Sequence, residues 1–239
     1  TRLGNYTQIF KNAVVIPDTD SGLDKAGRAS EMAYQTLKIA KEQKLDIEKA
    51  LFDNNKREAG SASAARELAG APCWFTSTIQ NKGSGGAHAA GTGADARTDG
   101  TQSALTQAKF DAAMQSIWEK GGKPDTVYLS AFQMNVALAF TGNNNQRSTV
   151  QAGDEKVVKS LDIYVTPWGT IEFMPTRENR SRDLYIMQND MWAVGVLRGT
   201  KNVELAKTGD NSTRQVVTEL TLISKNEKAS GMVVDLSTS

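Results

Sequence analysis

The side chains that could carry chemistry are few in this sequence of 239 residues, and they do not converge. His88 is the only histidine, so a Ser-His-Asp triad or a histidine-based metal site would have to form around it. Cys73 stands beside Trp74 and Phe75, which is typical of a small buried side chain rather than a nucleophile. No pair of carboxylates has a spacing that marks a glycosidase. We therefore predict no enzyme, with no catalytic residue, no cofactor and no metal ion.

The glycine-rich run 83–93 resembles a phosphate-binding loop only superficially. It lacks the lysine and hydroxyl residue of a P-loop, and no strand leads into it with the spacing of a dinucleotide fold. We predict a flexible or surface loop there.

Three arginines, Arg177, Arg180 and Arg182, cluster between two predicted strands. They could contact an anion or a partner. Equally, they could lie in a solvated loop in which Glu178 and Asp183 balance their charge.

The overall composition excludes several classes of protein. Lys and Arg number 28 and Asp and Glu 27, for a net charge of +1, which argues against a basic nucleic-acid-binding module. The single cysteine cannot form an internal disulfide. No apolar run has the length of a membrane span and no signal peptide is visible, so we expect no association with a membrane.

One long amphipathic helix is predicted from Ser21, as its N-terminal cap, to about residue 54. Such a helix would be on the order of 50 Å long and could act as a strut across the molecule. Its predicted apolar stripe follows steps of three and four residues: Leu23, Ala26, Ser30, Ala33, Leu37, Ala40, Lys44, Ile47 and Leu51.

The apolar residues among the first 17 predict a strand ahead of this helix, with no room to pair locally. Its partner must come from elsewhere in the chain or from a neighbouring molecule. From their alternation we predict four contacts between subunits: Tyr6, Ile9, Phe10 and Val14. A charged residue at Ile9 or Phe10 is expected to weaken assembly and leave the monomer folded.

The remaining elements mix helices and strands. A helix is expected at 101–120, followed by a strand at 126–130, a helix capped by Ser130 and a polar loop at 142–146. Beyond residue 157 the apolar period changes to two, which predicts hairpins around 167–169 and 208–212 and strands near 183–187, 192–197 and 232–236. The predicted class is α+β, with helices first and strands mostly later.

Several blocks of the sequence resemble a family of tailed-bacteriophage major capsid (major head) proteins. They lie at both ends of the chain and in the middle: residues 1–10, 24–28, 31–35, 46–48, 98–102, 122–125, 202–210, 219–222 and 226–231. The resemblance covers nearly the whole length, and 81–94 is its least similar part.

The resemblance implies the Hong Kong 97-type phage capsid fold. The expected parts are an extended-loop strand at 1–20, a peripheral domain at 21–122 with a spine helix at 21–55 and a second helix at 101–120, an axial domain at 123–199, and a return to the peripheral domain at 200–239. Members similar to this chain carry further residues before the match to Thr1. The chain is therefore expected to start inside a partial extended loop, and its first strand to lack a partner in this sequence.

The implied function is that of a structural protein of the virion. It would self-assemble in the host cytoplasm into capsomers of an icosahedral capsid that encloses packaged double-stranded DNA, without sequence-specific binding. The implied partners are copies of itself, a portal and decoration proteins. Some relatives crosslink a lysine to an asparagine, but no such pair is identifiable here.

Two alternatives remain open from the sequence. An encapsulin-like protein compartment would share the fold and differ in its cargo. A small-molecule-binding module or hydrolase would need a concave site with convergent polar groups, which the sequence does not indicate.

Overall fold

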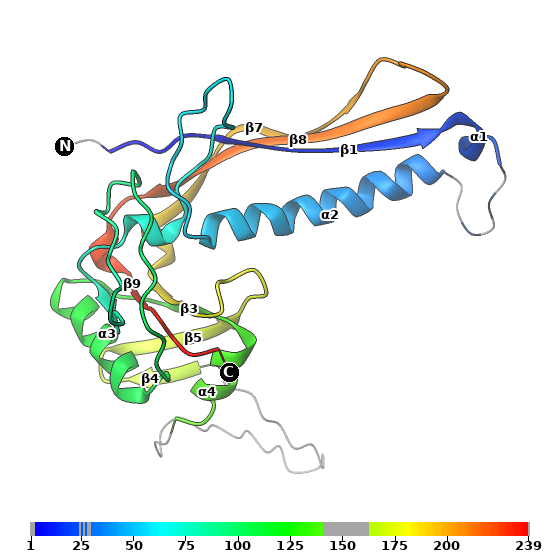
Figure 1. Ribbon diagram of the computed structural model, residues 1–239. Coiled ribbons are helices and arrows are strands. Elements are labelled where there is room, and N and C mark those ends of the chain that lie inside the picture. The colour runs from blue at the N-terminus through cyan, green and yellow to red at the C-terminus, as the bar shows by residue number, and fades with distance from the viewer. Residues whose placement is uncertain (1–2, 24, 26, 28–29, 141–162, 239) are drawn as a thin grey trace, which may run out of the picture.

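The computed structural model describes residues 3–23, 25, 27, 30–140 and 163–238. The molecule consists of a long arm and a compact body beneath one end of it (Figure 1). The arm is a three-stranded antiparallel sheet in the order β1-β8-β7, with one long helix along one face. Its elements are β1 (Gln8–Pro17), β7 (Trp192–Glu204), β8 (Asn211–Ser224) and α2 (Glu31–Phe52).

The N-terminal strand has its partner within this chain. β1 pairs with β8 from Gln8 opposite Leu220 to Pro17 opposite Asn211. The expectation that this strand lacks a partner in the sequence is therefore wrong. The partner lies near the opposite end of the sequence, where short-range patterns give no sign of the pairing.

The N-cap of the long helix lies nine residues later than predicted. Ser30 is the N-cap, and its hydroxyl accepts a hydrogen bond from the Ala33 amide at 3.3 Å. Asp18–Ser21 forms a separate single turn, α1. Between the two helices Gly27 has a φ of +82°, a left-handed conformation that ends any right-handed helix. The predicted start and cap at Ser21 are therefore wrong, whereas the predicted end agrees with Phe52 to within a few residues.

The face of α2 that lies against the sheet is centred on a polar residue. Gln43 is buried, and its Nε2 donates to the carbonyls of Phe10 at 2.9 Å and Val216 at 3.2 Å. Thr218 Oγ1 donates to the Gln43 side-chain oxygen at 3.2 Å. These bonds offset the cost of burying the amide. The predicted stripe is wrong at Leu37, which is 67% exposed, and right at Ile47 and Leu51, which pack against the apolar cluster where arm and body meet.

The body is built on a six-stranded sheet in the order β2-β9-β6-β3-β5-β4, with β2/β9 and β3/β5 parallel. Its strands are β2 (Ile79–Gln80), β3 (Thr126–Leu129), β4 (Ile163–Thr166), β5 (Gly169–Pro175), β6 (Leu184–Met187) and β9 (Gly231–Val233). Its helices are α3 (Gln107–Glu119) and α4 (Ala131–Ala137). Three short 3-10 turns are η1 (Ala71–Trp74), η2 (Asn189–Met191) and η3 (Glu227–Ala229).

Two apolar clusters hold these parts together. The first lies within the body, where Phe110 and Ile117 of α3 pack with Val127 and Phe173 of the sheet. The second lies at the junction of arm and body and contains side chains from both: Phe10, Leu68, Trp74, Phe75, Tyr185, Leu220 and Met232. Phe52, at the end of α2, contacts Tyr185, whose hydroxyl donates to the Phe52 carbonyl at 2.9 Å. The end of α2 therefore connects the arm to the body.

Several local predictions are confirmed. β3 lies at the predicted position, Ser130 caps α4, and β4 and β5 form the hairpin around 167–168. The packing divides the chain at other places than the expected domain boundaries. Residues 192–199 belong to β7 in the arm, α3 packs in the body, and β9 belongs to the body sheet. The predicted loop at 142–146 lies outside the described residues.

Candidate assembly surfaces

The isolated reactive side chains do not form a site. His88 is exposed, and its pKa is lowered by partial burial and by the nearby Lys82 and Arg97. Cys73 is fully buried, and burial raises the pKa of its thiol to about 12, which keeps it protonated. Within the described residues, no group of three or more His, Cys, Asp or Glu side chains could hold a metal ion. No helix in that part of the chain is long and apolar enough to cross a membrane.

The glycine-rich segment is a surface loop in which some glycines are closely packed. A Cβ atom on Gly83 would lie 2.1 Å from the Thr101 carbonyl oxygen, so only glycine fits there. The amides of Gly83 and Gly100 donate to the Asp235 carboxylate at 3.0 and 2.9 Å. The run has no helix or strand and about half of it is exposed, so the prediction of a surface loop is confirmed. Its small residues also allow close backbone packing around a buried carboxylate.

That carboxylate belongs to a cluster of alternating charges. Arg97 is central and pairs with Asp183 at 2.9 Å and with Asp235 at 3.1 Å, and all three side chains are fully buried. Arg180 and Arg182 pair with Asp183 and Asp235 from the partly exposed side. Asp99 bridges the three arginines at 2.6, 2.5 and 3.1 Å.

The two buried carboxylates titrate differently. Burial raises the pKa of Asp183 to about 6, despite the nearby Arg180 and Arg97. Burial alone would also raise the pKa of Asp235. Hydrogen bonds from two backbone amides and from Arg97 outweigh this effect, so the pKa of Asp235 is lowered. Arg180 and Arg182 are thus internal structural groups rather than an anion site. Sequence reasoning missed Arg97 and Asp235, whose positions in the sequence give no signal of contact.

Three of the four predicted contact residues lie in β1, on two different faces of it, and Tyr6 lies just before the strand begins. Phe10 and Val14 are buried, and Phe10 belongs to the apolar cluster at the junction. Tyr6 is 41% and Ile9 45% exposed. Only Tyr6 and Ile9 therefore have surface to offer a neighbouring subunit.

A second exposed surface, which sequence reasoning missed, lies along β7. This strand has a sheet partner on one side only, so the backbone groups of its other edge are free of sheet pairing among the described residues. Val194, Val196 and Leu197 are 48, 58 and 65% exposed. A long edge strand with exposed apolar side chains is suited to contact with another chain.

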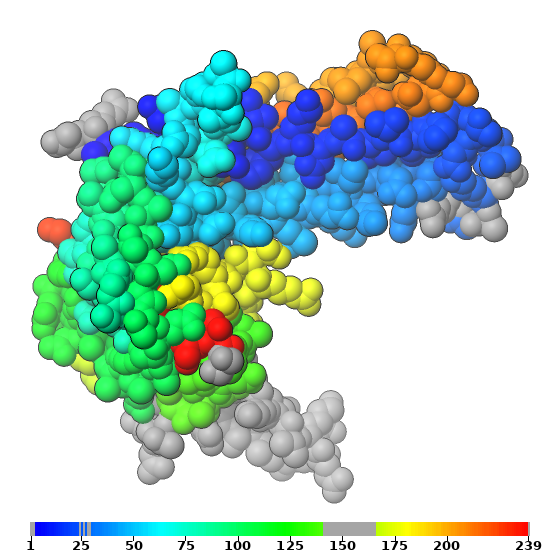
Figure 2. Space-filling model, viewed as in Figure 1, coloured from blue at the N-terminus to red at the C-terminus, as the bar shows by residue number. Residues whose placement is uncertain are grey.

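Where β7 begins, a cavity of about 330 Å³ opens between α2, β3 and β7. It is lined largely by apolar and aromatic side chains, among them Leu51, Phe52, Tyr128, Trp192 and Val194. Figure 2 shows the hollow between the arm and the body. Glu48, Asp125 and Glu172 act electrostatically on the hydroxyl of Tyr128, which lines the cavity, so three carboxylates lie near it.

Comparisons with known proteins give one family. A family model described as SU10 major capsid protein matches residues 1–237. The major capsid protein of Escherichia phage Phieco32 is 22% identical over 263 residues, covering 96% of this chain and 74% of that protein.

Solved structures show the same fold at low sequence identity. The Cyanophage A-1(L) capsid asymmetric unit is similar with a TM-score of 0.62 and 11% identity, covering 97% of this chain and 78% of that chain. The SrpI encapsulin of Synechococcus elongatus PCC 7942 is similar with a TM-score of 0.60 and 12% identity, covering 98% and 75%.

Proposed function

The chain belongs to the SU10 major capsid protein family, and we propose that it builds an icosahedral phage head by lateral association of many copies around packaged double-stranded DNA. It is a structural component of the virion capsid, not an enzyme, and it has the Hong Kong 97-type fold. The observation that carries this proposal is the family match over residues 1–237, together with the exposed apolar edge of the arm.

We propose that the arm and the body are the two domains expected of this fold. We assign the arm, formed by β1, α2, β7 and β8, to the peripheral domain at the rim of a capsomer. The body sheet with α3 and α4 would be the axial domain near its centre. Residues 107–119 and β9 pack in the body, so we assign them to the axial domain. Residues 192–199 belong to the arm, so we assign them to the peripheral domain.

The enclosed DNA would be held without tight binding. A net charge of +1 gives the shell little attraction for phosphate beyond local contacts, so DNA can move as it is packaged. Portal and decoration proteins are further proposed partners, at a unique vertex and on the outer surface respectively.

Assembly can be tested by measuring particle size. The purified protein is examined by light scattering and negative-stain electron microscopy over a range of salt and protein concentrations. We expect capsomer rings or closed shells. Monomers under every condition, from protein that is folded by circular dichroism, would contradict the proposed function.

An encapsulin-like compartment is the second candidate, supported by the similarity to the SrpI encapsulin fold. The contents of particles from infected cells distinguish a phage head from an encapsulin-like compartment. A phage head contains double-stranded DNA that nuclease cannot reach, whereas an encapsulin-like compartment would contain protein cargo.

A further inference from the structure

We infer that neighbouring copies meet side to side, with the β7 side of one copy receiving the Tyr6 side of the next. The receiving surface comprises the free edge of β7, the cavity at its start and the three carboxylates near that cavity. The donating surface comprises Leu3, Tyr6 and Arg57. This inference rests on the proposed function, since it assigns the surfaces through which shell subunits associate.

The receiving surface is apolar at its centre, with carboxylates near it. Tyr128, Trp192 and Val194 line the cavity, and Val194 is 48% exposed. Glu172 and Asp125 are exposed and act electrostatically on Tyr128, and Lys225 on the same side bonds to the Asp190 carbonyl. A large apolar or aromatic group accompanied by a positive charge is the chemistry that complements such a surface.

The donating surface offers that chemistry. Tyr6 is 41% exposed, and the Arg57 guanidinium lies 5.9 Å from the centre of its ring. Leu3, which is 48% exposed, adds apolar area nearby. An exposed aromatic residue with an arginine beside it is a common anchor at protein interfaces.

This surface is also held in place before any partner binds. Asn5 Nδ2 donates to the carbonyls of Ala69 at 3.2 Å and Leu222 at 3.0 Å, and Thr221 Oγ1 donates to the Tyr6 carbonyl at 2.8 Å. Arg57 donates to the Gly4 carbonyl. Fixing the backbone around Tyr6 lowers the entropy lost when a neighbour binds.

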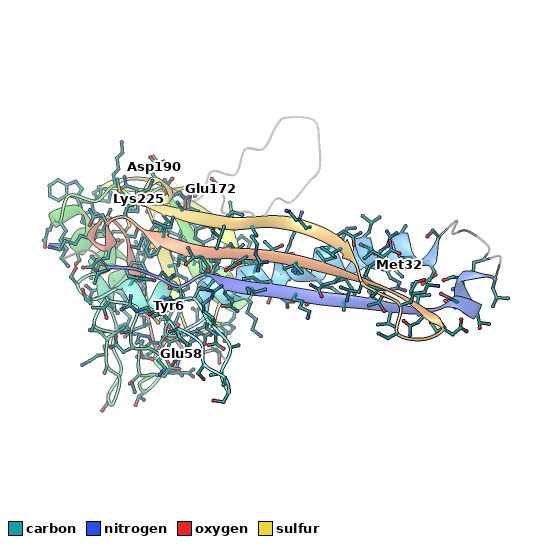
Figure 3. All side chains as sticks on the ribbon, turned by 90° about the horizontal axis from the view of Figure 1, so that it is seen from above. Tyr6, Met32, Glu58, Glu172, Asp190 and Lys225 are labelled. Atoms are coloured by element: carbon teal, nitrogen blue, oxygen red, sulfur yellow. The ribbon has the colours of Figure 1, made fainter. Side chains whose placement is uncertain are left out.

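The two surfaces lie on opposite sides of the arm. In the view of Figure 3, Glu172 and Asp190 lie on the side where β7 is the edge strand, and Tyr6 and Glu58 lie across the sheet on the β1 side. Two different surfaces on opposite sides make a head-to-tail contact, which closes into a ring when its rotation divides a full turn. A second copy of this chain is therefore the occupant to which the geometry points.

Paired cysteines test this contact. The double variant Tyr6→Cys with Val194→Cys is assembled, treated with a short bis-maleimide and run on a denaturing gel. Native Cys73 is fully buried, so it adds little background. We expect a ladder of covalent multimers up to the size of one capsomer ring, and neither single variant should give it.

The possible outcomes separate this inference from the proposed function. Particles that form but give no ladder would overturn the contact and leave the shell function intact. A covalent dimer from Val194→Cys alone would mean that two β7 sides meet each other, which also overturns it. Failure of the wild-type protein to form particles before any crosslinker is added would count against the proposed function itself.

Charge reversal at one of the carboxylates near the cavity gives an independent test. Glu172→Lys should lower the yield of particles at least about tenfold, because it places a positive charge opposite Arg57 of the next copy. Glu119→Lys, at the exposed end of α3 in the body, is the matched control and should leave the yield unchanged. Equal yields from the two variants would exclude Glu172 from the interface.

Discussion

At the scale of single residues, Asp183 links the stability of the body to pH. Its pKa of about 6 lies above the ordinary value of 3.8, so the folded state takes up a proton in a range where the unfolded chain does not. This contribution to stability is therefore largest below pH 3.8 and is lost as the pH rises through about 6. The pKa of Asp235 is lowered, so its contribution to stability is present above the ordinary value of 3.8 and is lost as the pH falls below it.

Replacing Asp183 should remove that dependence. On lowering the pH from 7 to 5, the wild-type protein should gain about 1 kcal/mol in free energy of unfolding relative to Asp183→Asn. Urea unfolding at the two pH values measures this difference, with Asp46→Asn on the exposed face of α2 as the control. If the free energy of unfolding changed equally with pH in the wild type and in Asp183→Asn, Asp183 would not be the group that takes up the proton.

Gln43 is the second residue with a specific expected effect. Gln43→Ala removes three buried hydrogen bonds between α2 and the sheet and leaves a small cavity. We expect a loss of about 2 kcal/mol in the free energy of unfolding. Gln115→Ala, whose side chain is exposed on α3, should cost less than about 0.5 kcal/mol. A similar small loss in both variants, measured by urea unfolding, would contradict this role for Gln43.

At the scale of elements, β1 separates folding from assembly on its two faces. Phe10→Lys buries a charge in the junction cluster, and we expect it to cost at least about 3 kcal/mol and prevent folding. Ile9→Lys places its charge on the exposed face, opposite Glu219, so the monomer should stay folded while assembly weakens.

Circular dichroism melting and light scattering distinguish the two effects. Because Phe10 is buried and Ile9 is 45% exposed, we now expect the monomer to stay folded only for the substitution at Ile9. Normal shells from soluble Ile9→Lys would remove the outer face of β1 from the assembly surfaces.

The same elements show which predictions local sequence patterns allow. Helix α3, strand β3, the Ser130 cap and the β4–β5 hairpin follow from apolar period, capping residues and turn residues, all of which act over a few positions. The start of α2 was missed because the apolar pattern does not reveal that Gly27 adopts a left-handed conformation, which no right-handed helix can include. The buried face of α2 was missed because it is centred on Gln43, whose burial depends on carbonyls of two distant strands.

At the scale of the whole molecule, the fold and the family followed from the resemblance of sequence blocks, whereas the surfaces did not. The cavity beside β7 combines residues from α2, β3, η2 and β7, so no single stretch reveals it. The charge cluster likewise joins Arg97 to Asp235 across 138 positions. Such contacts depend on the completed topology.

The pairing of β1 with β8 has a consequence for the time course of folding. The ribosome makes β1 and α2 well before β8, the central strand of their sheet. Contacts between segments so distant in sequence form slowly, because a long loop must close before they gain stability. The arm can therefore mature only after β8 has been made, and until then β1 and α2 lack the strand that joins them into the sheet.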